Sequence, residues 1–371
     1  MRSDPSDQPI PEERRAAGVP MPQPRDDVRL MAGYHSPLVD VAVRLNVNES
    51  PWPPPAGWRH ELAAAVASLD AHRYPDREAT GLRRALGDLH GVGADQIFCA
   101  NGSNEVIQSV LLAYGGHGRT AVVFDPTYEL HAHIARITGT AVVRGERGLR
   151  FELDLGEVRR VAADALADVV FLCSPNNPTG RADTLDEISE VVSVAPGLVV
   201  VDEAYGQFAP QTALELLPGE ERVVVLRTFS KTWSMAALRL GYLVGAPEIV
   251  AALERVALPY HLDALKQAAG RVAIAYQADM HRRVAAIVAE RERLMGALGD
   301  LAVDFWPSDA NFILFRPRTS DAGQVWQGLV DRSVLVRDVS TRPRLEGCLR
   351  VTVGTPEEND AFVAALKEVT K

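Results

Sequence analysis

Four short runs of β-branched and other apolar residues constrain the fold more than any other feature of the sequence. They are AVVFD (121–125), VVFLC (169–173), LVVVD (198–202) and VVVLRT (223–228). Each run is almost continuously apolar, as is typical of strands buried on both faces of a largely parallel sheet. Segments with helical periodicity, such as 104–115 and 184–195, lie between them. The sequence therefore predicts a doubly wound α/β domain.

The alternation of short apolar strands and helices ends at about residue 259. Two long helical segments, 261–277 and 281–300, are followed by strand-like stretches at 311–316, 334–339 and 348–354. This order predicts a smaller α+β domain, which we expect residues 28–50 to join from the other end of the chain. The predicted division is a flexible N-terminal arm (1–27), a small domain (28–50 and 259–371) and a large α/β domain (51–258).

Composition excludes several classes of protein. A chain of 371 residues suggests roughly two domains, and its net charge of −10 argues against nucleic acid as a partner. No run of about 18 apolar residues occurs, so we expect neither export nor a membrane span. Cys99, Cys173 and Cys348 are odd in number and lie in or beside apolar runs, which fits reduced thiols in a cytoplasmic protein.

Polar side chains gather where the predicted strands end. Asn177 follows strand 169–173 in a turn between Pro175 and Pro178, and prolines stop a strand. Because the carboxyl ends of parallel strands share one edge of the sheet, the polar residues after the next two strands should lie near Asn177. These residues are Asp202, Tyr205, Thr228, Ser230, Lys231 and Arg239.

This set matches what pyridoxal 5'-phosphate requires of a protein. The cofactor needs a lysine amine for covalent attachment, a carboxylate at its ring nitrogen, donors to its phenolic oxygen and a phosphate cradle. Lys231 would supply the amine and Asp202 the carboxylate. Tyr205 and Asn177 would donate to the phenolic oxygen, and Ser230 and Arg239 would form part of the phosphate cradle. The cradle would also use Gly102 and Ser103, which open a helix and present unpaired backbone donors. We assign no metal site.

Longer strings identify a resemblance. SPNNPTG (174–180), VVDEAYGQF (200–208) and RTFSKTWSMAALRLGY (227–242) resemble the fold-type I aminotransferases, which depend on pyridoxal phosphate. The resemblance covers roughly residues 28–370. The string LVRDVSTRPRLEGCLRVTVGTPEEND near the end, with LNVNESP and HRYPDR early on, narrows it to the histidinol-phosphate aminotransferase subfamily. The implied fold is a large domain with a mainly parallel sheet between helices, plus a smaller α+β domain.

The resemblance also implies roles for individual residues. Tyr128 would stack on the cofactor ring. Tyr74 would reach the cofactor phosphate of a neighbouring subunit, which implies a homodimer with shared active sites. Asn104 and Thr228 would complete the cofactor site. The substrate would contact Tyr34, Asn46, Arg337 and Arg350, because arginine supplies the bidentate partner that a carboxylate or phosphate needs.

The expected reaction interconverts L-histidinol phosphate plus 2-oxoglutarate and imidazole acetol phosphate plus L-glutamate. An aromatic amino acid aminotransferase on the same fold is the alternative, and Trp52 favours it because Ser50-Pro51-Trp52 departs from the usual motif. A phosphothreonine decarboxylase of the same fold is a third possibility. A noncatalytic regulator is disfavoured because the segment before Val28 is too short and acidic for a DNA-binding domain.

Each residue also has a structural interpretation. Taken alone, Lys231 would be a solvated charge and Asp202 would cap a helix. Tyr128 and Tyr205 would be packing residues. Arg337 and Arg350 would protect an edge strand, and Tyr74 would start a turn at Pro75. Together these interpretations require independent coincidences at ordered spacings, so the cofactor interpretation is preferred.

Overall fold

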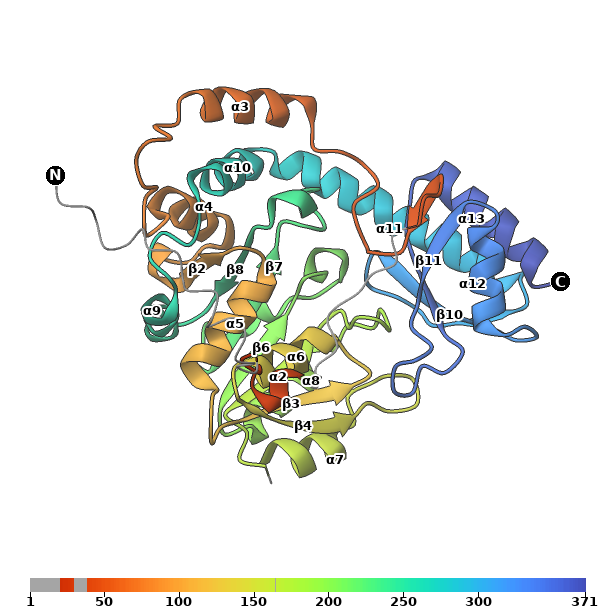
Figure 1. Ribbon diagram of the computed structural model, residues 1–371, viewed down its shortest axis with the longest axis horizontal. Coiled ribbons are helices and arrows are strands. Elements are labelled where there is room, and N and C mark those ends of the chain that lie inside the picture. Colours follow the sequence, from red (N-terminus) through yellow and green to blue (C-terminus); the bar gives the residue numbers. More distant parts are fainter. Residues whose placement is uncertain (1–20, 30–38, 164) are drawn as a thin grey trace, which may run out of the picture. The chain divides into compact units, whose positions relative to one another are not determined.

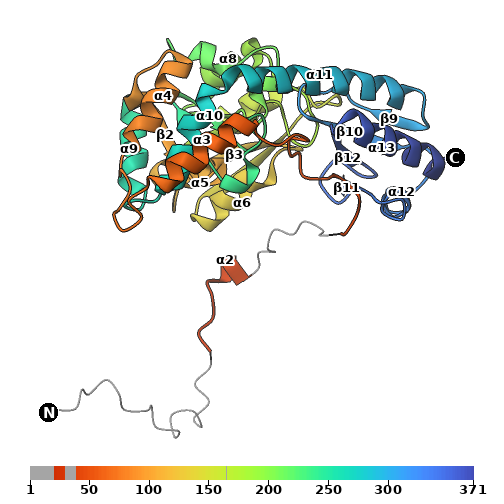
Figure 2. The same ribbon diagram turned by 90° about the horizontal axis from the view of Figure 1, so that it is seen from above.

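The computed structural model describes residues 21–29, 39–163 and 165–371. Residues 21–29 belong to a separate unit, Met1–Pro37, and contain one turn of helix, α2 (Asp26–Arg29), drawn in Figures 1 and 2. Tyr34 lies outside the described residues. The flexible arm expected over 1–27 therefore stays a prediction.

A seven-stranded sheet has the order β2-β8-β7-β6-β5-β3-β4. Strands β3 to β7 pair in parallel, whereas β8 is antiparallel to both β7 and β2. The four predicted strands are confirmed as β3, β5, β6 and β7, so the prediction of a largely parallel sheet is confirmed too. The strands are β2 (Ile97–Ala100), β3 (Thr120–Asp125), β4 (Ala141–Glu146), β5 (Val169–Cys173), β6 (Leu198–Asp202), β7 (Val223–Thr228) and β8 (Gly241–Val244).

Helices cover both faces of this sheet (Figure 1). Along β6, Val200 packs into the core formed with one group of helices, and Val199 and Val201 pack into the core on the other face. Burial on both sides is the reason the strands read as continuous apolar runs. The first group is α5 (Ser103–Tyr114), α6 (Glu129–Ile137) and α9 (Pro247–Val256); the second includes α7 (Leu155–Val158) and α8 (Leu185–Val194).

Three further helices cover the part of the sheet that contains β2 and β8. They are α3 (Ala56–Ala67), α4 (Thr80–His90) and α10 (Ala264–Ala275), and α10 packs against both of the others. Trp58 of α3 is buried in their shared core, and its indole Nε1 donates to the carbonyl oxygen of Ala269, 3.3 Å away. This packing holds α3 against a segment more than 200 residues later in the chain.

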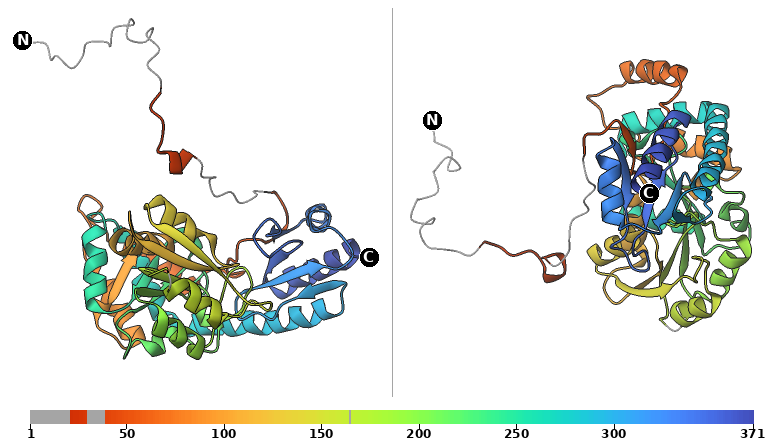
Figure 3. Two further views of the ribbon diagram at one scale, coloured as in Figure 1. Left: turned by 90° about the horizontal axis from the view of Figure 1, so that it is seen from below. Right: turned by 90° about the vertical axis from the view of Figure 1, so that its right-hand side faces the viewer.

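A second sheet has five strands in the order β1-β11-β12-β10-β9. Residue 43 of β1 pairs in parallel with residue 334 of β11, so the early segment joins the C-terminal part of the chain as expected. The blue C-terminal elements gather around this sheet in Figure 3. The strands are β1 (Val43–Leu45), β9 (Val303–Phe305), β10 (Phe312–Pro317), β11 (Val334–Asp338) and β12 (Leu349–Thr352).

Helix α11 (Gln277–Gly299) connects the two sheets. It contacts the turn Gly206–Phe208, which follows β6, and also β9 and β10 of the second sheet (Figure 2). Helices α12 (Ala322–Val330) and α13 (Pro356–Val369) pack on the second sheet. Both sheets lie in one unit, Leu38–Lys371, and the domain boundaries expected at residues 50 and 259 stay predictions. Among the described residues, no helix is long and apolar enough to cross a membrane.

Candidate active site

The polar residues predicted at the strand ends come from three adjacent strands. Strands β5, β6 and β7 are neighbours and parallel, with Cys173 opposite Asp202 and Asp202 opposite Leu226. The segments after them, which carry Asn177, Tyr205 and Lys231, therefore leave the sheet at the same edge. The register of the sheet is what brings residues so far apart in sequence to one place.

Lys231 has a partly buried amine with an unusual partner. Its Nζ donates to the backbone oxygen of Val47 at 3.0 Å and lies 5.8 Å from the ring centre of Tyr205. Burial, together with the positive charges of Arg350 and Arg239 and against the opposing effect of Glu49, lowers the pKa of this amine to about 7. A lysine with this pKa has a substantial neutral, nucleophilic fraction near pH 7.

Asp202 is buried and held by two donors. Its Oδ1 accepts from the backbone N–H of Ala204 at 3.0 Å, and its Oδ2 lies 3.0 Å from Nε2 of His131. The His131 ring, fully buried, stacks on Phe171 of β5 with centroids 4.7 Å apart. The sequence analysis missed His131. His131 could have been identified from its spacing: it follows Tyr128 by three residues, about one helical turn further along the chain.

Tyr128 lies beside His131. Its ring meets His131 edge-on at a centroid distance of 5.3 Å, and its hydroxyl donates to Oδ1 of Asn104 at 3.2 Å. Asn104 belongs to the first turn of α5, where the predicted phosphate donors lie. The two predicted residues Tyr128 and Asn104 are therefore in direct contact.

Tyr205 is buried against the second sheet. Its ring packs edge-on against Phe312 at 5.0 Å, and its hydroxyl accepts a hydrogen bond from Nδ2 of Asn48 at 2.9 Å. Burial raises the pKa of the Tyr205 phenol to about 12, so the phenol keeps its proton at neutral pH. Asn48 is a second residue that the sequence analysis missed, although it lies two positions after the predicted Asn46.

Arg350 joins the second sheet to the loop after β5. Its guanidinium donates to Oδ1 of Asn177 at 2.6 Å and to the backbone oxygen of Asn46 at 2.9 Å, and it lies over the ring of Phe312 at 5.0 Å. Arg337 on β11 is the cross-strand partner of Arg350 on β12. Directly opposed residues of an antiparallel pair project from the same face, so two cations face the same region.

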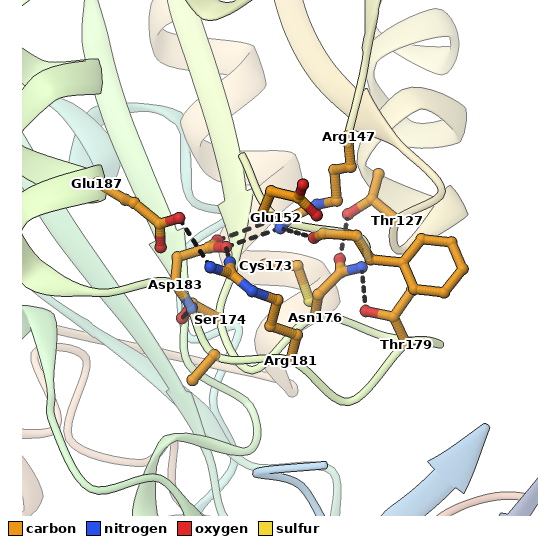
Figure 4. Close-up of polar contacts among 12 residues, drawn as sticks. Thr127, Arg147, Glu152, Cys173, Ser174, Asn176, Thr179, Arg181, Asp183 and Glu187 are labelled. Atoms are coloured by element: carbon orange, nitrogen blue, oxygen red, sulfur yellow. Dashed lines mark hydrogen bonds and ion pairs between the residues drawn. The ribbon is translucent and has the colours of Figure 1, made fainter. Parts of the chain in front are cut away.

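A second set of hydrogen bonds braces the loop after β5 (Figure 4). Asn176 donates through Nδ2 to the backbone oxygen of Pro126 at 2.9 Å and to the hydroxyl of Thr179 at 2.8 Å, and Thr127 donates to its Oδ1 at 2.9 Å. The two adjacent asparagines therefore differ in role. Asn176 holds the loop, whereas Asn177 contacts Arg350.

An anion cradle forms where α5 begins. Gly102 precedes the helix with a φ of +83°, and a Cβ there would lie 2.8 Å from Nη2 of Arg239, so the position suits glycine. Arg239 donates to the hydroxyl of Ser230 at 3.1 Å, and Thr228 donates to the same oxygen at 3.0 Å. A helix start with Ser103, two hydroxyls and a guanidinium fits a phosphate group.

Tyr74 lies away from these residues. Its ring is 79% exposed and stacks on the ring of Tyr260, with centroids 4.4 Å apart and planes 15° apart. Within this single chain Tyr74 has no contact with Lys231 or Arg239 among the interactions of the described residues. The expected role of Tyr74 in a neighbouring subunit stays a prediction.

The described residues fit the predicted cofactor. A lysine with a lowered pKa, a buried carboxylate, a phenol and a phosphate cradle from α5 and Arg239 occur on one edge of the sheet. Groups of three or more histidine, cysteine or acidic side chains that would bind a metal ion do not occur in the described part of the chain.

The comparisons with known proteins agree on one family. The family model described as aminotransferase class I and II matches residues 40–366. Histidinol-phosphate aminotransferase of Streptomyces avermitilis is 45% identical over 360 residues, which cover 94% of this chain and 96% of that protein. The enzyme of the same name from Mycobacterium marinum is 42% identical, with 94% of each chain covered.

A solved structure agrees with these relatives. Histidinol-phosphate aminotransferase from Sinorhizobium meliloti, in complex with pyridoxal-5'-phosphate, superposes with a TM-score of 0.81 at 25% identity. The match covers 89% of this chain and 91% of that one.

Proposed function

The chain belongs to the class I and II aminotransferases, and from this membership we propose that it transfers the amino group of L-histidinol phosphate to 2-oxoglutarate. The products are imidazole acetol phosphate and L-glutamate, a step of histidine biosynthesis. The single observation that carries the choice of substrate is the pairing of Arg337 with Arg350 across β11 and β12. Two guanidinium groups on one face of the sheet offer two charged donors, which suits a dianionic phosphate better than a single carboxylate.

We assign the cofactor, pyridoxal 5'-phosphate, to the edge of the seven-stranded sheet. When bound, it supplies an electron sink that stabilises negative charge on the substrate carbon. Lys231 would bind it covalently, Asp202 would hold its ring nitrogen, and Tyr205 with Asn177 would donate to its phenolic oxygen. The cradle at the start of α5, described above, would hold its phosphate, and Tyr128 would pack on its ring.

The chain's own groups account for proton transfer and charge. Once the substrate amine has displaced Lys231 from the cofactor, its free Nζ would take a proton from the substrate carbon that bears the amine, and its pKa of about 7 suits a base that works near neutral pH. His131 stabilises the charge and orientation of Asp202 through the 3.0 Å contact between them. Burial of both side chains strengthens this interaction by removing competing water.

The substrate's anionic end would bind the two arginines. In the half-reaction with histidinol phosphate they would hold the phosphate, and in the half-reaction with glutamate they would hold a carboxylate. Arg350 also contacts Asn177, so binding of an anion at Arg350 is coupled to the amide that would donate to the cofactor. Tyr34 and Asn46 would complete the substrate site.

We further propose that the protein is a homodimer with shared active sites in the cytoplasm. Tyr74 is held in a stack with Tyr260 but is otherwise exposed, as expected of a residue that acts on a partner subunit. The three cysteines are free and buried, which suits a reducing compartment.

An aromatic amino acid aminotransferase is the second candidate. Trp52 packs against the cluster that contains Tyr205 and Phe312, close to the region where a substrate side chain would lie. An aromatic wall there would favour a phenyl or phenol ring as well as an imidazole ring.

One experiment separates the two candidates. The kcat/KM values for histidinol phosphate and phenylalanine are measured with 2-oxoglutarate in the wild type, Arg337→Ala and Arg350→Ala. If two arginines hold the phosphate, Arg337→Ala should cost histidinol phosphate about 2 to 4 kcal/mol in kcat/KM and cost phenylalanine much less. Arg350→Ala should impair both donors. Equal losses for the two donors in Arg337→Ala would favour the aromatic enzyme instead.

A further inference from the structure

Asn48 has a backbone conformation and a degree of burial that are both unusual for a polar residue in a loop. Its φ is +57°, in the left-handed region, which asparagine tolerates better than most residues with a side chain. It is 1% exposed, and Asn311 donates to its backbone oxygen at 3.1 Å. The surrounding structure therefore fixes this residue in place.

Thr352 sets the orientation of the Asn48 amide. The Thr352 hydroxyl accepts from the backbone N–H of Asn48 at 3.0 Å and donates to its Oδ1 at 3.1 Å. Since that hydroxyl has one proton and gives it to Oδ1, the other end of the amide, Nδ2, must point the other way. There it lies 2.9 Å from the hydroxyl oxygen of Tyr205.

The consequence concerns the proton of Tyr205. A phenol has one proton to donate, and its oxygen can accept as well. Because Asn48 Nδ2 can only donate, the Tyr205 oxygen is the acceptor in this hydrogen bond, and the phenol proton remains free to be donated elsewhere. An aspartate at position 48 would reverse this polarity by accepting the proton.

We infer that Asn48 is a positioning residue for Tyr205: it directs the phenol proton towards the phenolic oxygen of the cofactor. The inference rests on the proposed role of Tyr205 and extends it to a residue 157 positions earlier in the chain. A proton donated to that oxygen stabilises its negative charge and so weakens its hold on the proton of the neighbouring lysine–cofactor linkage.

The test is a pH titration of the visible absorbance of the cofactor-loaded protein. Asn48→Asp should raise the apparent pKa of the lysine–cofactor linkage by about one to two pH units, the equivalent of one hydrogen bond to a charged group. Tyr205→Phe should raise it by a similar amount, because it also removes the donor.

The double variant separates the proton from the added charge. An aspartate at 48 brings a negative charge in either background, but it can capture the phenol proton only where Tyr205 is present. Asn48→Asp should therefore shift the apparent pKa clearly more in the wild-type background than in the Tyr205→Phe background. Equal shifts in the two backgrounds, or no shift in either, would overturn the inference.

Asn48→Gly is the matched variant for the fold. Glycine keeps the positive φ at low cost but removes the amide donor. It should raise the apparent pKa less than Asn48→Asp, and the rise should disappear in the Tyr205→Phe background. A rise that persists there would also count against the inference. If borohydride does not bleach the visible absorbance band of the wild-type protein and attach the cofactor to Lys231, the proposed cofactor site itself is refuted.

Discussion

The amine of Lys231 has a cost for folding as well as a use in catalysis. Burial and two nearby guanidinium groups lower its pKa from 10.5 to about 7. The unfolded chain therefore binds more protons than the folded chain between about pH 7 and 10.5, so this group adds to the free energy of unfolding as pH rises through that interval. Below pH 7 the destabilising effect is fully present.

This difference predicts a pH-dependent effect of Lys231→Met on the cofactor-free protein. Relative to the wild type, the variant should gain more free energy of unfolding at pH 6 than at pH 9, with a difference of up to about 2.7 kcal/mol. Urea unfolding at the two pH values measures it, and Lys266→Met is a control that removes a lysine from a partly exposed ion pair. The same gain at both pH values would mean that the folded-state pKa is close to its ordinary value.

At the scale of secondary-structure elements, a buried ion pair braces the loop between β5 and α8. Arg147 follows β4 and contacts Asp183 with two hydrogen bonds of 2.7 and 2.9 Å, and both side chains are almost completely buried (Figure 4). The backbone N–H of Asp183 also donates to the hydroxyl of Ser174 at 2.9 Å. This bracing fixes the ends of the loop that carries Asn177.

Removing one partner of that ion pair should therefore destabilise the protein and disturb the active site. Arg147→Met leaves the Asp183 carboxylate buried without its main partner, which should cost about 3 to 5 kcal/mol in the free energy of unfolding. We also expect a lower kcat because Asn177 loses its support. In the control Arg159→Met, the lost pair with Glu190 is largely exposed and should cost about 1 kcal/mol or less. Similar losses in the two variants, measured by urea unfolding, would contradict the bracing role.

At the scale of the whole molecule, the exposed stack of Tyr74 on Tyr260 predicts that two chains are needed for one active site. Variants Tyr74→Ala and Lys231→Ala should each be nearly inactive, but a mixture refolded together should recover about a quarter of the wild-type activity. Random pairing makes half of the dimers mixed, and each mixed dimer has one intact site.

The size of the assembly and a second mixture provide the controls. Size-exclusion chromatography with light scattering should give a dimer, and Tyr74→Ala mixed with Tyr74→Phe should show no comparable recovery. Full activity in a demonstrated monomer would contradict the shared site. Activity close to that of the wild type in the Tyr74→Ala protein on its own would also contradict the shared site.

The parallel sheet and the residues on its carboxyl edge could be predicted from the sequence alone. Continuous apolar runs require burial on both faces, and the ends of adjacent parallel strands must meet, so Asp202, Tyr205, Lys231 and the Asn177 loop were identifiable without coordinates. The helix start at Ser103 was also predictable, because Gly102 and the polar residues after it favour that boundary.

Which distant side chains support those residues could not be predicted, because it depends on how the whole chain folds. His131 reaches Asp202 because α6 packs on β3 and β4 and the His131 ring stacks on Phe171 of β5, and Asn48 reaches Tyr205 because β1 joins the second sheet beside β11. The opposition of Arg337 and Arg350 depends on the register of β11 and β12. A strand shifted by one residue would turn the arginine to the other face, and neither local propensity nor periodicity specifies register or long-range packing.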